Sequence, residues 1–195
     1  MGLALFPMLS TVNLAGNDIS KALGWTGCGG IRSIDISGNR IRSIAAGDLV
    51  PLTALTSLRL ADNGLKQLGG LAPLQTLQVL DLTGNRVHDM VEIEKLAALP
   101  YLADLRLQGN PVCRRQLYRL AVLRHLDLLH RLDDTPATDE EKQRASAMFD
   151  GDEGGGHGGG GGMPGVGGGL GHTTPGGTVT YYTADSPHRG GAGGG

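Results

Sequence analysis

The sequence predicts an α/β solenoid, a right-handed coil of short stacked units with parallel strands on one side and helical or 3₁₀ turns on the other. A six-residue segment recurs five times and always ends in Asn, as VNLAGN, IDISGN, LRLADN, LDLTGN and LRLQGN. The steps between these Asn residues are 22, 24, 22 and 25 residues. A unit of this length cannot bury its own apolar face, so consecutive units must stack.

Apolar residues keep fixed positions 14, 11, 8, 5 and 3 residues before each Asn. Alternation at the last two positions predicts a short strand, and the threefold steps before it predict a helical or 3₁₀ turn. The predicted core residues are Leu3, Phe6, Leu9, Val12 and Leu14; Trp25, Cys28, Ile31, Ile34 and Ile36; Leu49, Leu52, Leu55, Leu58 and Leu60; Leu71, Leu74, Leu77, Leu80 and Leu82; and Leu96, Leu99, Leu102, Leu105 and Leu107. A further apolar residue follows each Asn by two places, at Ile19, Ile41, Leu65, Val87 and Val112.

The repeated Asn has a structural role of its own. Its amide both donates and accepts hydrogen bonds, so it can satisfy backbone groups at the bend after each strand. Leaving such a buried group unpaired costs about 1–3 kcal/mol. The Gly that precedes the Asn in four of the five segments suits a bend in which a Cβ would crowd the chain.

The pattern LxxLxLxxN, repeated five times over residues 3 to about 145 with its flanks, resembles the leucine-rich repeat family. The period of about 22 residues resembles the intracellular eukaryotic subclass that includes a regulator of protein phosphatase one, outer-arm dynein light chain one and the spliceosomal A-prime subunit. Such a resemblance is specific for fold and much less so for function.

The segment after Asn110 resembles the C-terminal cap of that family, with NPVC, then YR, then LDD and an acidic helix. Leu117, Leu120, Ala121 and Leu123 stand at helical spacing. Thr138 and Glu141 form a T-x-x-E capping box that predicts a last helix to about Met148. We therefore divide the chain into five repeats (1–110), a cap (111–149) and a Gly-rich disordered tail (150–195).

The tail holds 21 of the 34 Gly residues and cannot bury enough apolar surface to offset its ordering entropy. Its one β-prone stretch, TVTYYT at 178–183, reads either as spacer or as a peptide that adds to another protein's sheet. At the other end, only Met1 and Gly2 precede Leu3, so we expect an upstream extension or a partner to cover the first strand.

Composition excludes several classes of function. The net charge of -2 does not fit a strongly basic nucleic-acid binder, and no apolar run approaches the roughly 18 residues of a membrane span. Cys28 and Cys113, only two thiols, fit structural roles in a reducing compartment. The six His residues are scattered, and no catalytic triad or carboxylate pair is evident, so we expect no enzyme activity, no cofactor and no metal.

Two surfaces are candidate binding sites. The concave face comprises the side chains 6, 4 and 2 places before each Asn, which alternate with the core residues. Its middle column alternates in charge and can pair laterally or fix the register of a partner. The concave-face candidates are Asn13, Ser33, Asp35, Ser37, Arg59, Asp81, Thr83, Asp104, Arg106 and Gln108.

The second surface, the basic rim, follows each Asn and comprises Arg40, Arg42, Lys66, Arg86 and His88. A rim of this kind attracts acidic segments or phosphates, although a solvated edge that aids solubility has the same composition.

We therefore expect a non-enzymatic scaffold that binds protein partners of unknown identity through the concave face and the rim. The family resemblance implies a cytoplasmic protein associated with a cilium, a flagellum or the cytoskeleton. Its alternatives are a nuclear ribonucleoprotein component that holds a small RNA-binding partner, so that contact with nucleic acid is indirect, and a phosphatase regulator. No membrane partner is expected.

Overall fold

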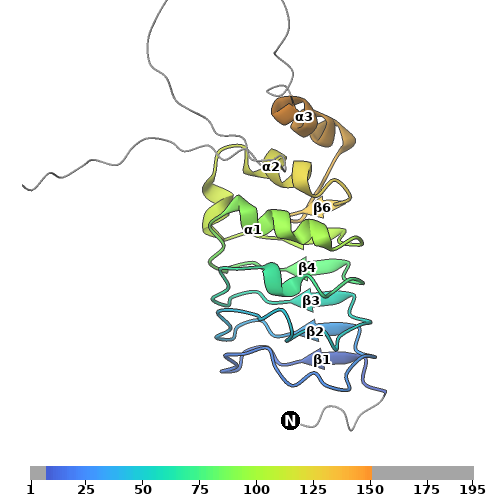
Figure 1. The fold of residues 1–195 in the computed structure, drawn as a ribbon. Helices are drawn as coiled ribbons and strands as arrows, with labels where there is room; N and C mark the ends of the chain where they lie inside the picture. The colour runs from blue at the N-terminus through green and yellow to red at the C-terminus, as the bar shows by residue number, and fades with distance from the viewer. Residues whose placement is uncertain (1–7, 151–195) are drawn as a thin grey trace, which may run out of the picture. The chain divides into compact units, whose positions relative to one another are not determined.

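The computed structural model describes residues 8–150, with side chains to residue 148. Five three-residue strands stack in sequence order in one parallel sheet: β1 (Thr11–Asn13), β2 (Ser33–Asp35), β3 (Ser57–Arg59), β4 (Val79–Asp81) and β5 (Asp104–Arg106) (Figure 1). Residues at the same distance from the repeated Asn pair across every step, as Val12 does with Ile34 and Leu58 with Leu80. The predicted solenoid and the position of its strands are confirmed.

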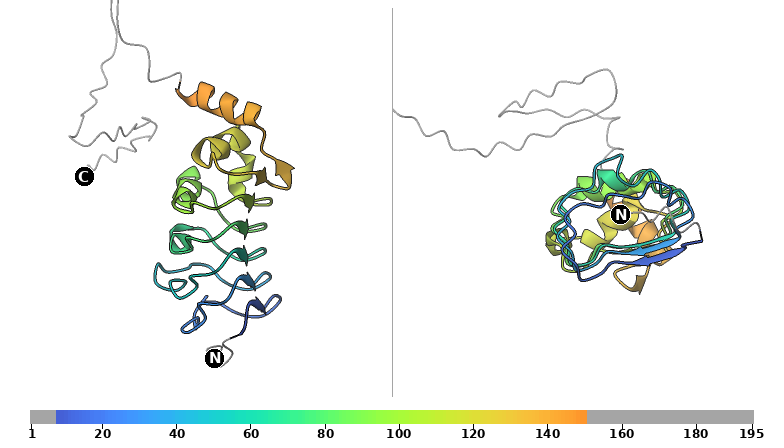
Figure 2. Two further views of the ribbon diagram at one scale, coloured as in Figure 1. Left: turned by 90° about the vertical axis from the view of Figure 1, so that its right-hand side faces the viewer. Right: turned by 90° about the horizontal axis from the view of Figure 1, so that it is seen from below.

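The return path behind the sheet becomes more helical along the chain (Figure 2). Residues 14–32 and 36–56 return through turns, whereas the later units form η2 (Gly69–Leu71), α1 (Met90–Glu94) and η3 (Lys95–Ala98). The return over residues 14–32 contains the Gly-rich run TGCGG, which disfavours helix, while MVEIEKLAA between β4 and β5 is rich in helix formers.

The core lies between the sheet and this return path. From Val12 onward every predicted core residue is buried except Leu14 and Ile19, which are partly buried along with Leu9; Leu3 and Phe6 lie outside the described residues. Trp25 and Cys28 are 3% and 4% exposed, so both fill positions that Leu holds in later units. The two residues therefore act as core side chains, as predicted.

The repeated Asn residues join each unit to the one before it. Asn63 donates from Nδ2 to Ile36 O of the preceding unit (3.0 Å) and to Leu60 O of its own unit (3.1 Å). Its Oδ1 accepts the backbone N–H of Ile41, also in the preceding unit (2.9 Å). Equivalent bonds are made by Asn39, Asn85 and Asn110, which are all buried. We call this set the Asn ladder.

The residue before each Asn adopts a left-handed backbone conformation. Gly16, Gly38, Gly84 and Gly109 have φ between 63° and 74°, a region that costs Gly little. Asp62 occupies this position in the third unit with φ 52°, which Asp tolerates better than most residues. The left-handed backbone thus explains Gly at the bend better than the predicted crowding, because a Cβ at Gly16 would meet nothing within 4 Å.

Residues 111–150, for which we keep the name cap, comprise η4 (Pro111–Arg114), α2 (Tyr118–His125), β6 (Arg131–Leu132), β7 (Thr135–Pro136) and α3 (Asp139–Asp150). Strand β6 continues the parallel sheet beside β5, and β7 then pairs with β6 in the antiparallel direction. Of the four residues at helical spacing, Leu120, Ala121 and Leu123 lie in α2, but Leu117 precedes the helix with φ 59° and is 44% exposed. Val122 and Leu123 are the buried residues of α2.

Asp133 ends the regular repeat. In the fourth unit the N–H of Leu82 donates to the next strand's carbonyl at Arg106, but the equivalent N–H of Leu107 donates to the Asp133 carboxylate (2.7 Å). The other carboxylate oxygen accepts the Tyr118 hydroxyl (2.9 Å), and burial raises the pKa of that hydroxyl well above its ordinary value. A side chain thus replaces the backbone of a complete sixth strand.

Arg119 of α2 holds the other cap elements together. Its guanidinium donates to both carboxylate oxygens of Glu141 in α3 (2.8 and 2.9 Å) and to the carbonyls of Leu132 and Pro136. These bonds with Arg119 lower the pKa of Glu141 to about 2. The predicted capping box is confirmed, since Thr138 and Glu141 exchange side chain to backbone hydrogen bonds.

We expect Asn63→Ala to lower the free energy of unfolding by about 2–4 kcal/mol, because several buried backbone groups lose their partner. Asn17→Ala is the matched control, since Asn17 is exposed and bonds only to carbonyls of its own unit, at Leu14 and Ala15. It should cost less than about 1 kcal/mol. Urea unfolding of both variants measures the difference, and equal losses would contradict a ladder between units.

Glu141→Gln should destabilise the cap in a pH-dependent way. The folded-state pKa lies below the ordinary value of 4.5, so the stabilisation is present at neutral pH and is lost as pH falls from about 4.5 to about 2. We expect a loss of roughly 0.5–1.5 kcal/mol at pH 7 that disappears near pH 2. Denaturant unfolding at several pH values measures it, with exposed Glu140→Gln as the control; a constant difference at all pH values would contradict the ion pair.

Candidate functional site

No group of three His, Cys, Asp or Glu side chains in residues 8–148 is arranged to hold a metal ion. His157, His172 and His188, like the stretch 178–183, lie outside the described residues. No described helix is both long and apolar enough to cross a membrane.

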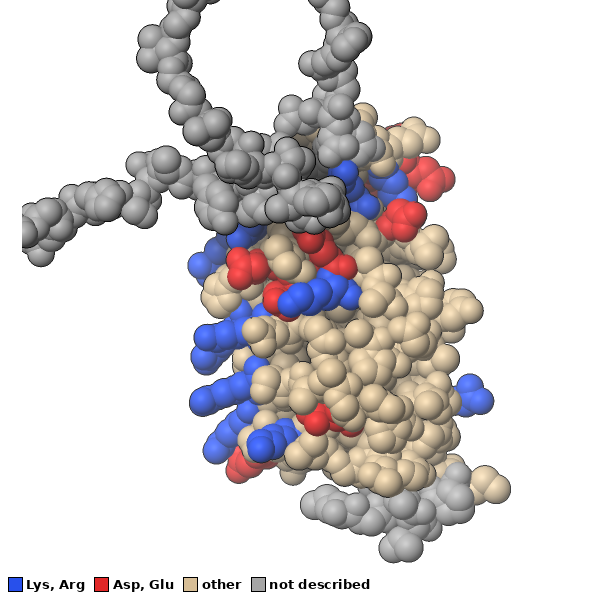
Figure 3. Space-filling model, in the orientation of Figure 1, with Lys and Arg blue, Asp and Glu red and all other residues tan. Residues whose placement is uncertain are grey.

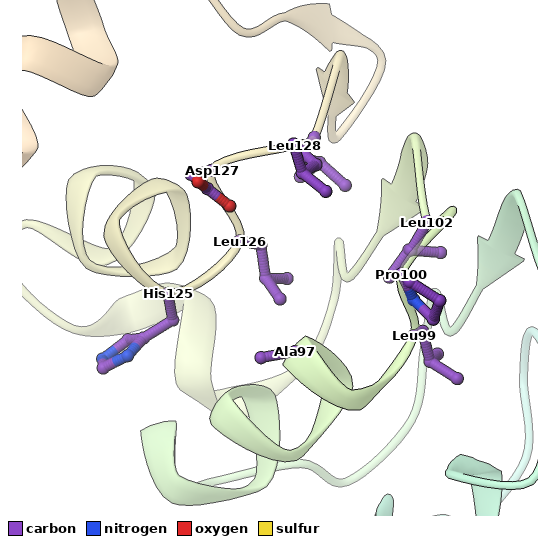
Figure 4. Close-up of a pocket in the computed structure, with 9 residues that line it drawn as sticks. Ala97, Leu99, Pro100, Leu102, His125, Leu126, Asp127 and Leu128 are labelled. Atoms are coloured by element: carbon purple, nitrogen blue, oxygen red, sulfur yellow. The ribbon is translucent and has the colours of Figure 1, made fainter. Parts of the chain in front are cut away.

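The hollow between the last repeat and the cap is small and mainly apolar (Figure 4). Leu99, Leu102 and Leu126 line it, and its volume of about 60 Å³ is far below the roughly 300 Å³ of a small-molecule site. His125 stands at its margin, with Nε2 3.3 Å from Glu94 Oε1. The hollow is a packing gap where the cap meets the solenoid.

The residues predicted for the concave face lie on the strands of the sheet and directly after them. Asn13, Asp35, Arg59, Asp81 and Arg106 align in one column, because each is the last residue of its strand and the strands pair in register. The first residues of the strands form a parallel column that includes Ser33 and Asp104. The predicted Ser37, Thr83 and Gln108 follow β2, β4 and β5 at the same offset.

Acidic and basic side chains of the middle column pair laterally, as predicted. Asp35 Oδ2 lies 3.8 Å from Arg59 Nη1, and Asp81 Oδ2 lies 3.7 Å from Arg106 Nη1. These separations are too long for hydrogen bonds, so each pair is a weak ionic contact. Arg59 keeps 57% of its side chain exposed.

The acidic side chains of this column also have a local role that the sequence analysis missed. One carboxylate oxygen of Asp35 accepts the N–H of Ser37, and Asp81 does the same for Thr83 (both 3.0 Å). Asn13 uses its amide oxygen in the same way towards Ala15 (3.0 Å). Where the residue four places before the repeated Asn is Asp or Asn, its side chain therefore fixes the bend after the strand. The short polar side chains in these three units were the available signal.

The cap adds one ion pair to each of the two columns beyond the predicted residues. Arg131 of β6 pairs with Asp104 across the sheet (3.9 Å), and Asp134 pairs with Arg106 (2.9 Å). Gln108 donates to Asp133 O (3.1 Å), which ties the last repeat to the cap. Asp104 Oδ1 is buried without a hydrogen-bond partner. Leu123, Leu126, Leu129 and Leu132 recur every three residues, and this spacing was the signal that Arg131 begins a sixth, incomplete strand.

The basic rim lies on a different surface, and Lys and Arg side chains gather along one edge of the stacked units in Figure 3. Arg40, Arg42 and Arg86 surround one hollow of about 170 Å³ whose other lining residues are Asn39, Asn63 and Gly64. Lys66 and His88 are exposed at positions equivalent to Arg42 in the next two units but do not line this hollow. The structure thus brings together three of the five predicted rim residues.

Comparisons with known proteins agree with this architecture. Residues 75–157 match a family model described as leucine-rich repeat. The chain is 38% identical over 97 residues to leucine-rich repeat-containing protein 36 of Mus musculus, an alignment covering 49% of this chain and 13% of that protein. It is 41% identical over 99 residues to leucine-rich repeat-containing protein 23 of Xenopus tropicalis, covering 50% and 28%. The chain thus spans less than a third of either relative.

Among solved structures, the fold is similar to a chain of the Drosophila melanogaster SNF/U2A' complex, with a TM-score of 0.64 and 23% identity over 72% of this chain and 83% of that one. At this identity the likeness concerns the fold alone. The register of the strands, the Asn ladder and these matches together show that the described repeats form a leucine-rich repeat solenoid.

Proposed function

We propose that this chain is a non-enzymatic scaffold that holds a protein partner against its concave face. The observation that carries the proposal is the aligned column of alternating charge, from Asp35 to Arg106, on the open face of the sheet. Its ion pairs, with N–O separations of 3.7–3.8 Å, are weak, so little free energy is lost when a partner's charges replace one member of a pair. The same charges reject a partner whose charges are out of register.

The composition of the face limits the kind of interface. The concave-face residues include no aromatic side chain, and large aromatic anchors dominate tight interfaces. We therefore infer that the column sets register and specificity, whereas apolar contacts elsewhere on the partner's footprint supply most of the affinity.

A cytoplasmic scaffold at a cilium, a flagellum or the cytoskeleton is the setting we propose. It is supported by the resemblance of the repeat period and of the NPVC, YR and LDD cap motifs to the intracellular subclass. Imaging the tagged full chain against axonemal tubulin tests it. Nuclear accumulation would instead favour the ribonucleoprotein alternative, and co-purification of a phosphatase catalytic subunit the regulatory one.

The column also offers a test of whether its charges serve the fold. A double-mutant cycle with Asp81→Asn and Arg106→Gln keeps the acceptor that fixes the bend, because Asn13 performs that task in the first unit. We expect a coupling energy in unfolding of about 0–1 kcal/mol. A coupling energy above about 2 kcal/mol would mean that the ion pairs of this column stabilise the fold, and it would weaken the proposal that they serve binding.

Binding is tested by neutralising the column. The triple variant Asp35→Asn, Arg59→Gln and Asp81→Asn should reduce recovery of the partner on affinity purification of the full chain about tenfold, since two or three ionic contacts of about 0.5 kcal/mol each are lost. The control Asp139→Asn, Glu140→Gln and Arg144→Gln changes the same charges on α3. Unchanged recovery with the first variant would refute concave-face binding.

A further inference from the structure

We propose that the hollow bounded by Arg40, Arg42 and Arg86 binds a phosphorylated side chain of a protein partner. This site is separate from the concave face and takes a different ligand. It lies on the edge where the chain leaves each Asn and begins the return path.

Gly64 creates the hollow. It is the first residue after Asn63, the position that Arg40 and Arg86 occupy in the units on either side. A Cβ at Gly64 would approach Arg42 Cγ to 3.2 Å, so a side chain there would crowd Arg42 and occupy the space. Because neighbouring strands lie about 4.8 Å apart, Arg40 and Arg86 stand about 10 Å apart with an open position between them. Two guanidinium forks can therefore reach one ligand from opposite sides.

Most of the positive charge of this site is not neutralised by a carboxylate of the described residues. Among residues 8–148, Arg42 and Arg86 have no carboxylate partner. Arg40 pairs with Asp18 (2.7 Å), but both side chains are more than 70% exposed, so this pair contributes little and is readily exchanged. The side-chain amides of Asn39 and Asn63 do not compete with the Arg residues for a ligand, because they already make the hydrogen bonds of the Asn ladder.

The number and kind of cations favour a phosphate monoester. Phosphoserine and phosphothreonine carry a charge of about -1.5 to -2 with three acceptor oxygens, which suits two or three guanidinium groups around one point. A single carboxylate would leave most of that charge uncompensated. Arginine forks match phosphate bidentately better than lysine does, and the hollow is lined by Arg alone among the cationic residues.

Nucleic acid fits the site less well. The rim residues extend over only a few units, about 10–15 Å, and contact two or three phosphates at most, whereas a tight nucleic-acid binder neutralises about 6–10. None of the residues lining the hollow is aromatic, so unpaired bases would find nothing to stack on. The net charge of -2 also gives the chain no long-range attraction for a polyanion.

The test titrates the ¹⁵N-labelled full chain with the peptide Gly-Ala-Gly-pSer-Gly-Ala-Gly and follows the backbone amides by NMR. Saturable shifts at Gly64 and its neighbours are expected, with a Kd of about 0.1–1 mM for so short a peptide. The double variant Arg42→Gln, Arg86→Gln should weaken binding at least tenfold. The control Arg32→Gln, Arg144→Gln removes two exposed Arg side chains elsewhere and should leave the Kd unchanged.

Three results would overturn the proposal. One is the absence of saturable shifts at Gly64 up to about 10 mM peptide. A second is equal binding of the peptide with Glu in place of pSer, which would make the site a general acidic-segment site. The third is tighter binding of a single-stranded or duplex oligonucleotide that is lost in the Arg42, Arg86 variant, which would assign the rim to nucleic acid. The concave-face triple variant should bind the phosphopeptide normally, so the two proposals fail independently.

Discussion

The hydrogen bonds of the Asn ladder determine the rest of the architecture. Each buried Asn amide accepts an N–H and donates to a carbonyl of the preceding unit, while also closing the bend of its own unit. Because the same bonds recur at Asn39, Asn63, Asn85 and Asn110, every unit sits on its neighbour in the same register. The apolar residues stabilise the stack by burial, but burial alone has no preferred register.

Register is what makes both surfaces useful. On the sheet it brings Asp35, Arg59, Asp81 and Arg106 into one column, although more than 20 residues separate each from the next. On the opposite side of the same bends it aligns the residues that follow each Asn, so that one Gly between two Arg residues leaves a gap of defined size. The repeated Asn and core residues keep the backbone of the strand and bend the same in every unit. A single residue that differs between units, such as Gly64, can therefore create a local site.

Much of the fold was predictable from the sequence because each unit repeats the same constraint. The strands, the buried registers including Trp25 and Cys28, and the helix that begins after Thr138 were all found where the pattern placed them. Leu117 stands at helical spacing but precedes α2, and spacing cannot reveal a left-handed residue before the helix. The cap pairs of Arg131 and Asp134 were missed because they depend on a turn at Asp133 that no period describes.

For the candidate sites, the sequence placed the side chains on the strands and after each Asn, where the structure has them. It did not reveal that Asp35 and Asp81 also accept hydrogen bonds from the backbone of the bend, or that Gly64 opens a hollow between guanidinium groups.

The hairpin of β6 and β7 closes the C-terminal edge of the sheet in a way that bears on self-association. Strand β7 runs against the direction of the strands before it and contains Pro136, which has no N–H to offer. An incoming chain would meet a strand of two residues in which only Thr135 has an N–H, so this edge is a poor template for further backbone pairing. The short antiparallel hairpin therefore disfavours filament growth by strand addition at the end of a sheet whose other strands are all parallel.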